Sequence, residues 1–312
     1  MPPTIRFAAV SERWEQYEAP LRAALAAQGL AEATLSPDPL PPETVDWIVY
    51  APNSDVQDFT PYTRLKGVLN LWAGVEDVVD NPTLTAPLAR MVDPGLTEGM
   101  VEWVTGHVLR HHLGIDHFLA HQDGTWAYRV PPLARARRVT ILGLGELGRA
   151  CAQALSALNF DVAGWARRPR EVPGVACHAG PDGLEAALAE ADIVVLLLPD
   201  TPATQNVLNG RTLALLAPGA VVINPGRGPL IDDDALLAAL DAGTLAHATL
   251  DVFRTEPLPP EHPFWAHSRV TVTPHVASAT RPESAAQVIA ENIARGEAGQ
   301  PLRHLVDRAA GY

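Results

Sequence analysis

Apolar runs and amphipathic stretches alternate along the chain in two successive series. In the first series, the predicted strands cover residues 4–10, 45–51 and 67–72. The stretch 14–29 has apolar residues at helical spacing and predicts a helix that ends at Gly29, and the proline cluster at 37–42 predicts a loop. Strands that alternate with helices are typical of a parallel sheet covered on both faces.

A long helix is predicted between the two series. Apolar residues keep helical spacing over residues 97–118, about six turns. Such a helix is long enough to connect two domains, and a proline-led basic loop follows it at 131–138. We expect the three histidines of this helix to have structural or surface roles; they are His111, His112 and His117.

The second series begins near Arg138 and repeats the alternation of strands and helices. Its predicted strands cover residues 139–145, 161–166, 192–199, 219–226, 247–253 and 269–275. Its predicted helices cover residues 146–160, 183–191 and 283–299. At 312 residues the chain is long enough for two domains. We therefore expect an α/β fold with two doubly wound parallel-sheet domains.

Composition and charge restrict the classes of partner. The net charge of −13 argues against general binding to nucleic acid or to an anionic membrane, since both would repel the protein. No run approaches eighteen apolar residues, and the first residues lack the pattern of a secretory signal. The two cysteines, Cys151 and Cys177, form no disulfide framework, and Cys151 is expected to pack inside. We expect a cytoplasmic protein without a bound metal.

A glycine-rich turn follows the first strand of the second series. Gly143, Gly145 and Gly148 have the G-x-G-x-x-G spacing between a predicted strand and a predicted helix. The first glycine permits a tight turn, the second lets the backbone approach a pyrophosphate, and the third lets the helix pack on the strand. The pyrophosphate would lie at the helix N-terminus, beside Glu146 and Leu147. The context predicts a dinucleotide site.

The segment GWARRPR, residues 164–170, indicates which dinucleotide. Sites for NAD place an acidic residue at the end of the second strand, where this chain has Ala166. An acid there would repel a 2′-phosphate, whereas Arg167, Arg168 and Arg170 offer guanidinium groups suited to phosphate. We expect NADP(H) as the preferred cofactor, with NAD(H) as the alternative. The competing interpretation is a solvated charged loop.

Several spaced motifs resemble the D-isomer-specific 2-hydroxyacid dehydrogenase family, and its NADP-dependent glyoxylate/hydroxypyruvate reductase branch in particular. With the glycine turn, the motifs are INPGRGPLIDDDAL at 223–236, LDVFRTEPLP at 250–259 and VTVTPHVASAT at 270–280. In addition, LWAGVEDVV at 71–79 resembles the family's substrate-carboxylate loop, and MVEWV at 100–104 the start of its interdomain helix.

The resemblance implies an organisation and an activity. A flavodoxin-like substrate domain would comprise residues 1–98, completed by the C-terminal helix 281–312. A Rossmann cofactor domain would comprise residues 99–280, with the reaction in the cleft between the two and a homodimer formed through the cofactor domain. The substrate would be a small 2-keto acid such as glyoxylate or hydroxypyruvate. The alternative on the same fold is a nicotinamide-sensing binding protein without enzymatic activity.

Three residues in these motifs have side chains suited to reducing a keto acid. His275 is the expected proton donor to the forming alkoxide, since imidazole titrates near neutrality. Glu256 is its expected partner and would orient the ring. Arg227 is the expected anchor of the substrate carboxylate and would polarise the carbonyl through its planar fork of donors.

Further contacts follow from the resemblance alone. Expected cofactor contacts are Leu198, Pro199, Thr204, Pro225, Gly226, Asp251 and Ser278. For Asp251 the alternative is a structural capping role, and for the loop of Pro199 and Thr204 it is a plain turn. Expected substrate contacts, besides Arg227 and His275, are Trp72, Ala73 and Gly74, the last two through backbone N–H groups. The bulk of Trp72 would narrow the pocket toward small keto acids.

Overall fold

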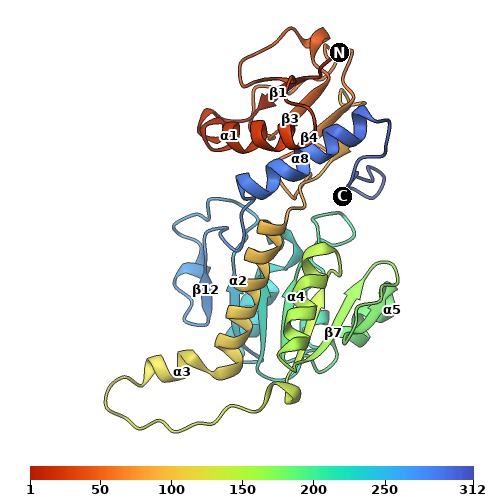
Figure 1. Cartoon of the computed structure of the whole chain (residues 1–312). Helices are drawn as coiled ribbons and strands as arrows, with labels where there is room; N and C mark the ends of the chain where they lie inside the picture. Colours follow the sequence, from red (N-terminus) through yellow and green to blue (C-terminus); the bar gives the residue numbers. More distant parts are fainter. The chain divides into compact units, whose positions relative to one another are not determined.

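A computed structural model describes residues 1–312, and the chain divides into two compact units (Figure 1). The first unit comprises residues 1–96 and 279–312, and the second comprises residues 97–278. Each unit contains one wholly parallel sheet with helices. The predicted α/β class with two parallel-sheet domains is confirmed.

The first unit is built on a five-stranded sheet of order β2-β1-β3-β4-β5. Its strands are β1 (Thr4–Ala8), β2 (Thr34–Ser36), β3 (Trp47–Tyr50), β4 (Gly67–Asn70) and β5 (Leu88–Ala89). This is the flavodoxin-like strand order, in which ligands bind beyond the carboxyl ends of the strands. The strands β1, β3 and β4 are almost entirely buried, as their apolar composition requires.

Two helices from distant parts of the sequence cover one face of this sheet. They are α1 (Ser11–Ala27) and α8 (Pro282–Glu297), which lie side by side (Figure 1); a short 3-10 turn, η1 (Pro42–Thr44), precedes β3. Ala285 and Ile289 of α8 belong to the same buried cluster as Ile5 of β1. At the other end of α8, Glu297 accepts a hydrogen bond from the Trp47 indole at 2.7 Å.

The second unit is built on a seven-stranded sheet of order β12-β11-β10-β9-β6-β7-β8. Its strands are β6 (Arg138–Leu142), β7 (Asp161–Ala166), β8 (Ala176–Ala179), β9 (Ile193–Leu196), β10 (Ala220–Asn224), β11 (Leu245–Leu250) and β12 (Val270–Val272). The order reverses between β6 and β9, which is the Rossmann arrangement with its switch point at the end of β6.

The helices of the second unit cover both faces of its sheet, as the two buried clusters that flank the strands show. They are α2 (Pro94–Leu113), α3 (Ile115–Ala120), α4 (Glu146–Ala157), α5 (Gly180–Leu188), α6 (Gly210–Leu213) and α7 (Asp233–Asp241), with 3-10 turns η2 (Ala134–Ala136), η3 (Gly228–Leu230) and η4 (Pro263–Trp265). Cys151 of α4 is fully buried, and burial raises the pKa of its thiol to about 12, so it is a packing residue as expected.

One helix prediction was wrong in extent. The continuous helix predicted over 97–118 is interrupted at Gly114, whose φ of 68° lies in the left-handed region. The apolar spacing continues across this position, but the helical conformation of the backbone does not, so α2 and α3 are separate helices. No helix in the structure combines the length and the apolar character needed to cross a lipid bilayer.

Polar side chains lie beneath α2 on the face of β11 and β12. His111 contacts the Thr249 hydroxyl at 2.9 Å, and His247 contacts the Thr271 hydroxyl at 2.8 Å. The two imidazole rings lie 5.0 Å apart. Burial lowers the pKa of His111 to about 3 and that of His247 to about 4, so both rings are neutral at physiological pH.

We expect acid to destabilise the second unit through this pair. Unfolded histidines take up protons near pH 6.5, whereas the two rings stay neutral in the folded protein down to about pH 3 and 4. The contribution of the neutral pair to the free energy of unfolding is therefore fully present above about pH 6.5, and it is lost progressively as the pH is lowered toward 4. At pH 5 each group removes at most about 2 kcal/mol. His111→Gln should abolish part of the loss between neutral pH and pH 5, measured by chemical denaturation. The rest comes from His247, His107 and His112, because burial lowers the pKa of each of these as well. Equal losses in both proteins would contradict this.

Candidate active site

The glycine turn lies between β6 and α4, and close packing explains two of its glycines. A Cβ on Gly143, whose φ is 107°, would lie 2.5 Å from the carbonyl oxygen of Leu197. A Cβ on Gly148 would lie 1.7 Å from the carbonyl oxygen of Gly143, so that α4 could not approach β6. By contrast, a Cβ on Gly145 would meet nothing within 4 Å. The turn is tight on the protein side and open at Gly145.

The N-terminus of α4 fits the pyrophosphate of a dinucleotide. Gly145 is the N-cap and provides no side-chain hydrogen bond to the first turn of the helix. The first N–H groups of α4 are therefore left for another acceptor, at the positive end of the helix dipole. Glu146 forms an ion pair with Arg149, and Leu147 is half-buried, so neither side chain caps the helix.

The end of β7 carries no acidic side chain. Ala166 is the last residue of the strand, and the indole of Trp165 beside it is fixed by a 2.7 Å hydrogen bond to the carbonyl of Gly180. Arg167 and Arg168 follow in the loop, and both are exposed. The structure thus places two guanidinium groups next to the strand end at which a ribose-binding acid is expected in NAD sites.

A buried asparagine shapes the turn that carries Arg227. Asn224 is the last residue of β10, and its Nδ2 donates to the carbonyl of Arg227 at 2.8 Å. Its Oδ1 accepts from the N–H of Gly226 at 3.1 Å, which closes the turn over Pro225. Sequence analysis did not single out Asn224. The signal for it is an asparagine at a strand end directly before a Pro-Gly turn.

Gly228 brings the Arg227 turn against the loop after β11. A Cβ on Gly228 would lie 2.0 Å from the carbonyl carbon of Phe253 and 2.4 Å from the nitrogen of Arg254. Only glycine permits this backbone contact. Two residues further along the same loop is Glu256, whose Oε1 accepts from the N–H of Phe253 at 2.9 Å. The Arg227 turn and the Glu256 carboxylate are therefore parts of one packed assembly.

Glu256 also contacts His275. Its Oε2 lies 2.7 Å from the Nδ1 of His275, with the two side chains 35% and 50% exposed. A carboxylate accepts and does not donate, so Nδ1 carries the proton of this hydrogen bond. The partner fixes the ring orientation and leaves Nε2 as the nitrogen that faces other groups. The predicted pairing of these two residues is present in the structure.

Asp251 organises the loop that carries His275. It is fully buried, and its Oδ1 accepts from the Thr273 hydroxyl at 2.5 Å and the Val276 N–H at 2.9 Å. Its Oδ2 accepts from the Ala277 N–H at 2.8 Å, and its carbonyl accepts from the N–H of His275. His275 itself has a φ of 52° in the left-handed region. These bonds correspond to the structural capping role that was the alternative for Asp251.

The remaining expected cofactor residues lie in loops of the second unit. The hydroxyl of Thr204 donates to the carbonyl of Pro199 at 2.7 Å and accepts from the N–H of Thr201 at 2.9 Å, so it holds this loop together. Leu198 in the same segment is buried. Ser278 lies against α2, since a Cβ on Gly99 would be 2.7 Å from its hydroxyl.

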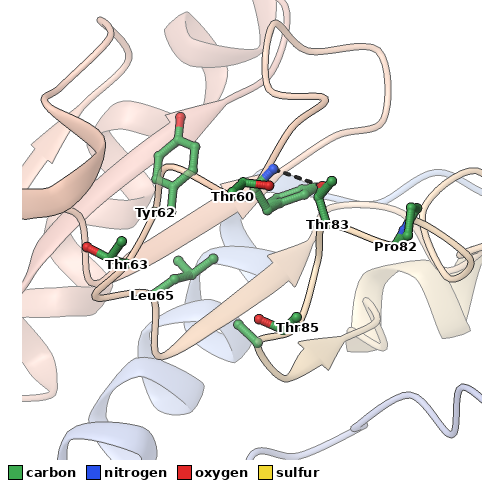
Figure 2. Close-up of a pocket in the computed structure, with 9 residues that line it drawn as sticks. Thr60, Tyr62, Thr63, Leu65, Pro82, Thr83 and Thr85 are labelled. Atoms are coloured by element: carbon green, nitrogen blue, oxygen red, sulfur yellow. Dashed lines mark hydrogen bonds between the residues drawn. The ribbon is translucent and has the colours of Figure 1, made fainter.

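The expected substrate loop belongs to the first unit. Trp72, Ala73 and Gly74 follow β4, and Trp72 is exposed. A separate cavity of about 550 Å³ lies in the same unit (Figure 2). It is lined by Phe59, Thr60, Tyr62, Thr63, Leu65, Pro82, Thr83, Thr85 and Ala86. None of the expected site residues lines this cavity, so it is not part of the candidate active site.

Comparisons with known proteins show which family the chain is similar to. The sequence model of the family "D-isomer specific 2-hydroxyacid dehydrogenase, NAD binding domain" matches residues 106–277. The glyoxylate/hydroxypyruvate reductase A of Serratia proteamaculans (strain 568) is 44% identical over 257 residues, which cover 80% of this chain and 82% of that protein. The corresponding reductase of Yersinia enterocolitica is 41% identical over the same length and the same shares of the two proteins.

Two solved structures are similar over the whole chain. The D-isomer specific 2-hydroxyacid dehydrogenase from Xanthobacter autotrophicus Py2, in complex with NADPH and MES, has a TM-score of 0.93 and 39% identity over 100% of both chains. The NADPH-dependent glyoxylate/hydroxypyruvate reductase from Sinorhizobium meliloti, in complex with NADP and sulfate, has a TM-score of 0.87 and 36% identity over 100% of both chains.

Proposed function

This chain belongs to the D-isomer specific 2-hydroxyacid dehydrogenase family, and we propose that it reduces small 2-keto acids, glyoxylate or hydroxypyruvate among them, with NADPH. The observation that carries the proposal is the 2.7 Å contact between His275 and Glu256, packed through Gly228 against the Arg227 turn. Relatives at 44% and 41% identity that are glyoxylate/hydroxypyruvate reductases support an enzyme over a nicotinamide-sensing binding protein.

The cofactor would be held by the second unit. When bound, NADPH supplies the hydride for the carbonyl carbon of the substrate. The open turn at Gly145 and the uncapped start of α4 would bind its pyrophosphate. Arg167 and Arg168 would bind the 2′-phosphate, which no acid at position 166 repels. Pro199, Thr204, Pro225, Gly226 and Ser278 would line its remaining surface.

The chain's own residues would handle the proton and the substrate carboxylate. Protonated His275 would donate from Nε2 to the oxygen that becomes the alkoxide, while Nδ1 keeps its proton toward Glu256. Glu256 holds the ring, and Glu256 is itself held because its Oε1 accepts a hydrogen bond from the N–H of Phe253. Arg227 would bind the carboxylate through its planar fork and polarise the carbonyl. Ala73 and Gly74 would add backbone N–H donors.

We also propose that the protein is a homodimer formed through an arm, defined as residues 119–133, which begins in the last two residues of α3 and continues beyond it. Five large apolar side chains of this arm are exposed: Leu119, Trp126, Tyr128, Val130 and Leu133. Trp126 is 90% exposed, which is unusual for a tryptophan. The arm extends away from the sheet of its own unit (Figure 1). A second copy of the chain would cover it.

The proposed location is the cytoplasm. Both cysteines are free thiols, which fits the reducing conditions of that compartment.

The first test is of the reaction itself. The wild type should oxidise NADPH in the presence of glyoxylate or hydroxypyruvate, and His275→Ala should lower kcat by roughly two to four powers of ten, the usual scale of general acid catalysis. NADPH binding, measured by fluorescence titration, should be nearly unchanged. His262→Ala, a histidine of another loop of the same unit, is the matched control. Unchanged turnover of the His275 variant would remove this residue from the mechanism.

The second test concerns the cofactor. Two charge-assisted hydrogen bonds to the 2′-phosphate, at about 1.5–3 kcal/mol each, give roughly a hundredfold or greater preference for NADPH over NADH in kcat/KM. Ala166→Asp should remove most of this preference, because the carboxylate binds the ribose hydroxyls and repels the phosphate. The double variant Arg167→Gln, Arg168→Gln should lower kcat/KM with NADPH and leave kcat/KM with NADH unchanged. Arg13→Gln, on the other unit, should change kcat/KM with neither cofactor. Equal use of both cofactors by the wild type would mean that the arginines form only a charged loop.

The third test concerns the arm. Replacing Trp126 and Tyr128 together by serine should convert the dimer to a monomer, since the two side chains are 90% and 78% exposed and would form the centre of the contact. Sedimentation velocity measures the change. Trp265→Ser, at a 51% exposed tryptophan outside the arm, should leave the dimer intact. A monomeric wild type, or a double variant that stays dimeric, would contradict the assignment.

A further inference from the structure

The loop after β4 is held by an asparagine that sequence analysis did not single out. Asn70 is the last residue of β4 and only 1% exposed. Its Nδ2 donates to the carbonyl of Trp72 at 2.9 Å and to that of Gly74 at 2.8 Å. Carbonyl oxygens only accept, so the amide nitrogen has to face them and the orientation of the amide is settled. One buried side chain thus fixes two carbonyls of the loop.

Two further groups of the same unit hold the carbonyls of this loop. The hydroxyl of Thr280 donates to the carbonyl of Leu71 at 3.0 Å. The N–H of Met91 donates to the carbonyl of Trp72 at 3.1 Å. The carbonyls of Leu71, Trp72 and Gly74 are therefore all drawn toward the body of the unit.

The N–H groups of the loop are treated differently. Those of Trp72, Ala73, Gly74 and Val75 donate to no acceptor within the protein. Four successive donors without protein acceptors, on a loop in which three carbonyls already have donors, carry positive partial charges that suit an anion. The loop LWAGV has no basic side chain, so its attraction for an anion comes from these backbone donors.

The environment of Asn70 indicates that stability is not its only role. Its Oδ1 is buried and has no hydrogen-bond partner. An unpaired buried acceptor costs free energy, which an apolar side chain of similar size would avoid. What an apolar side chain cannot supply is the pair of donors to Trp72 and Gly74. The amide is therefore suited to shaping the loop rather than to filling the core.

We propose that Asn70 is a positioning residue: it turns the carbonyls of Trp72 and Gly74 inward and so presents the N–H groups of residues 72–75 to the carboxylate of the substrate. The inference rests on the proposed reduction of 2-keto acids and adds to it the residue that creates the donor set. Asn70 acts through the loop backbone and does not touch the substrate itself.

The test compares two buried asparagines of the first unit. Asn70→Ala should raise KM for glyoxylate at least tenfold, while KM for NADPH stays within twofold and kcat at saturation falls less than KM rises. Asn292→Ala is the matched control, since Asn292 is 2% exposed and bonds to the backbone of Arg303, not to the backbone of the loop. It should lower Tm without changing either KM. Should Asn70→Ala fail to fold, Thr280→Val removes one tie to the same loop and should raise KM for glyoxylate severalfold.

A binding measurement separates this inference from the proposed reaction. Oxalate, a dicarboxylate that cannot be reduced, is titrated calorimetrically into each protein saturated with NADPH. If the wild type binds oxalate and Asn70→Ala binds it at least tenfold more weakly, the inference stands even when no keto acid is reduced. Equal oxalate affinity and equal KM for glyoxylate in the two proteins would overturn it. So would an equal rise of KM in Asn292→Ala, because that would reflect general loosening.

Discussion

The hydrogen-bond ladder of a parallel sheet ends where its strands end, and the functional loops of this protein depend on what replaces it. Three buried side chains do so: Asn70 at the end of β4, Asn224 at the end of β10 and Asp251 directly after β11. The two asparagines bond to backbone groups two to four residues further along the chain. Asp251 bonds to backbone groups of the neighbouring loop after β12. Because these groups are buried, their bonds are shielded from water and hold the loops in one shape.

The candidate active site is a consequence of this arrangement. Asn224 shapes the turn that carries Arg227, and Asp251 shapes the loop that carries His275. Between them, the contact of Gly228 with the backbone of Phe253 sets the distance from the Arg227 turn to the Glu256 loop. The side chains that would perform the reaction are half-exposed, while the groups that orient them are buried. The reactive groups therefore remain accessible to ligands, while the buried groups determine their geometry.

Much of this could be predicted from the sequence, because the signals were local and redundant. The strand 161–166 was predicted with the bounds that β7 has, and the family and fold class are confirmed. The strands β2, β5 and β8 were missed, since each is short and, unlike β3 or β9, none lies within a longer apolar run. The interruption at Gly114 was missed because a single glycine does not disturb the apolar spacing.

The roles of individual polar residues were less accessible. Thr204 and Asp251 belong to family motifs, but which partners their oxygens have follows from loop conformations that no spacing encodes. Asn70 was overlooked because attention fell on the loop residues that follow it, whereas the side chain that donates to their carbonyls belongs to the preceding strand. A buried amide at the end of a parallel strand is a usable signal for such positions.

The position of α8 has a consequence for the order in which the polypeptide becomes structured during synthesis. Ala285, Ile289 and their neighbours complete the core that β1 and α1 begin, yet they emerge from the ribosome after the entire second unit. The segment 97–278 has its own cores and can fold while translation continues. The earlier segment, with one face of its sheet only partly covered, has to wait for the last residues. The first unit is therefore completed only after the second unit has been synthesised, and until then its apolar surface is exposed to chaperones.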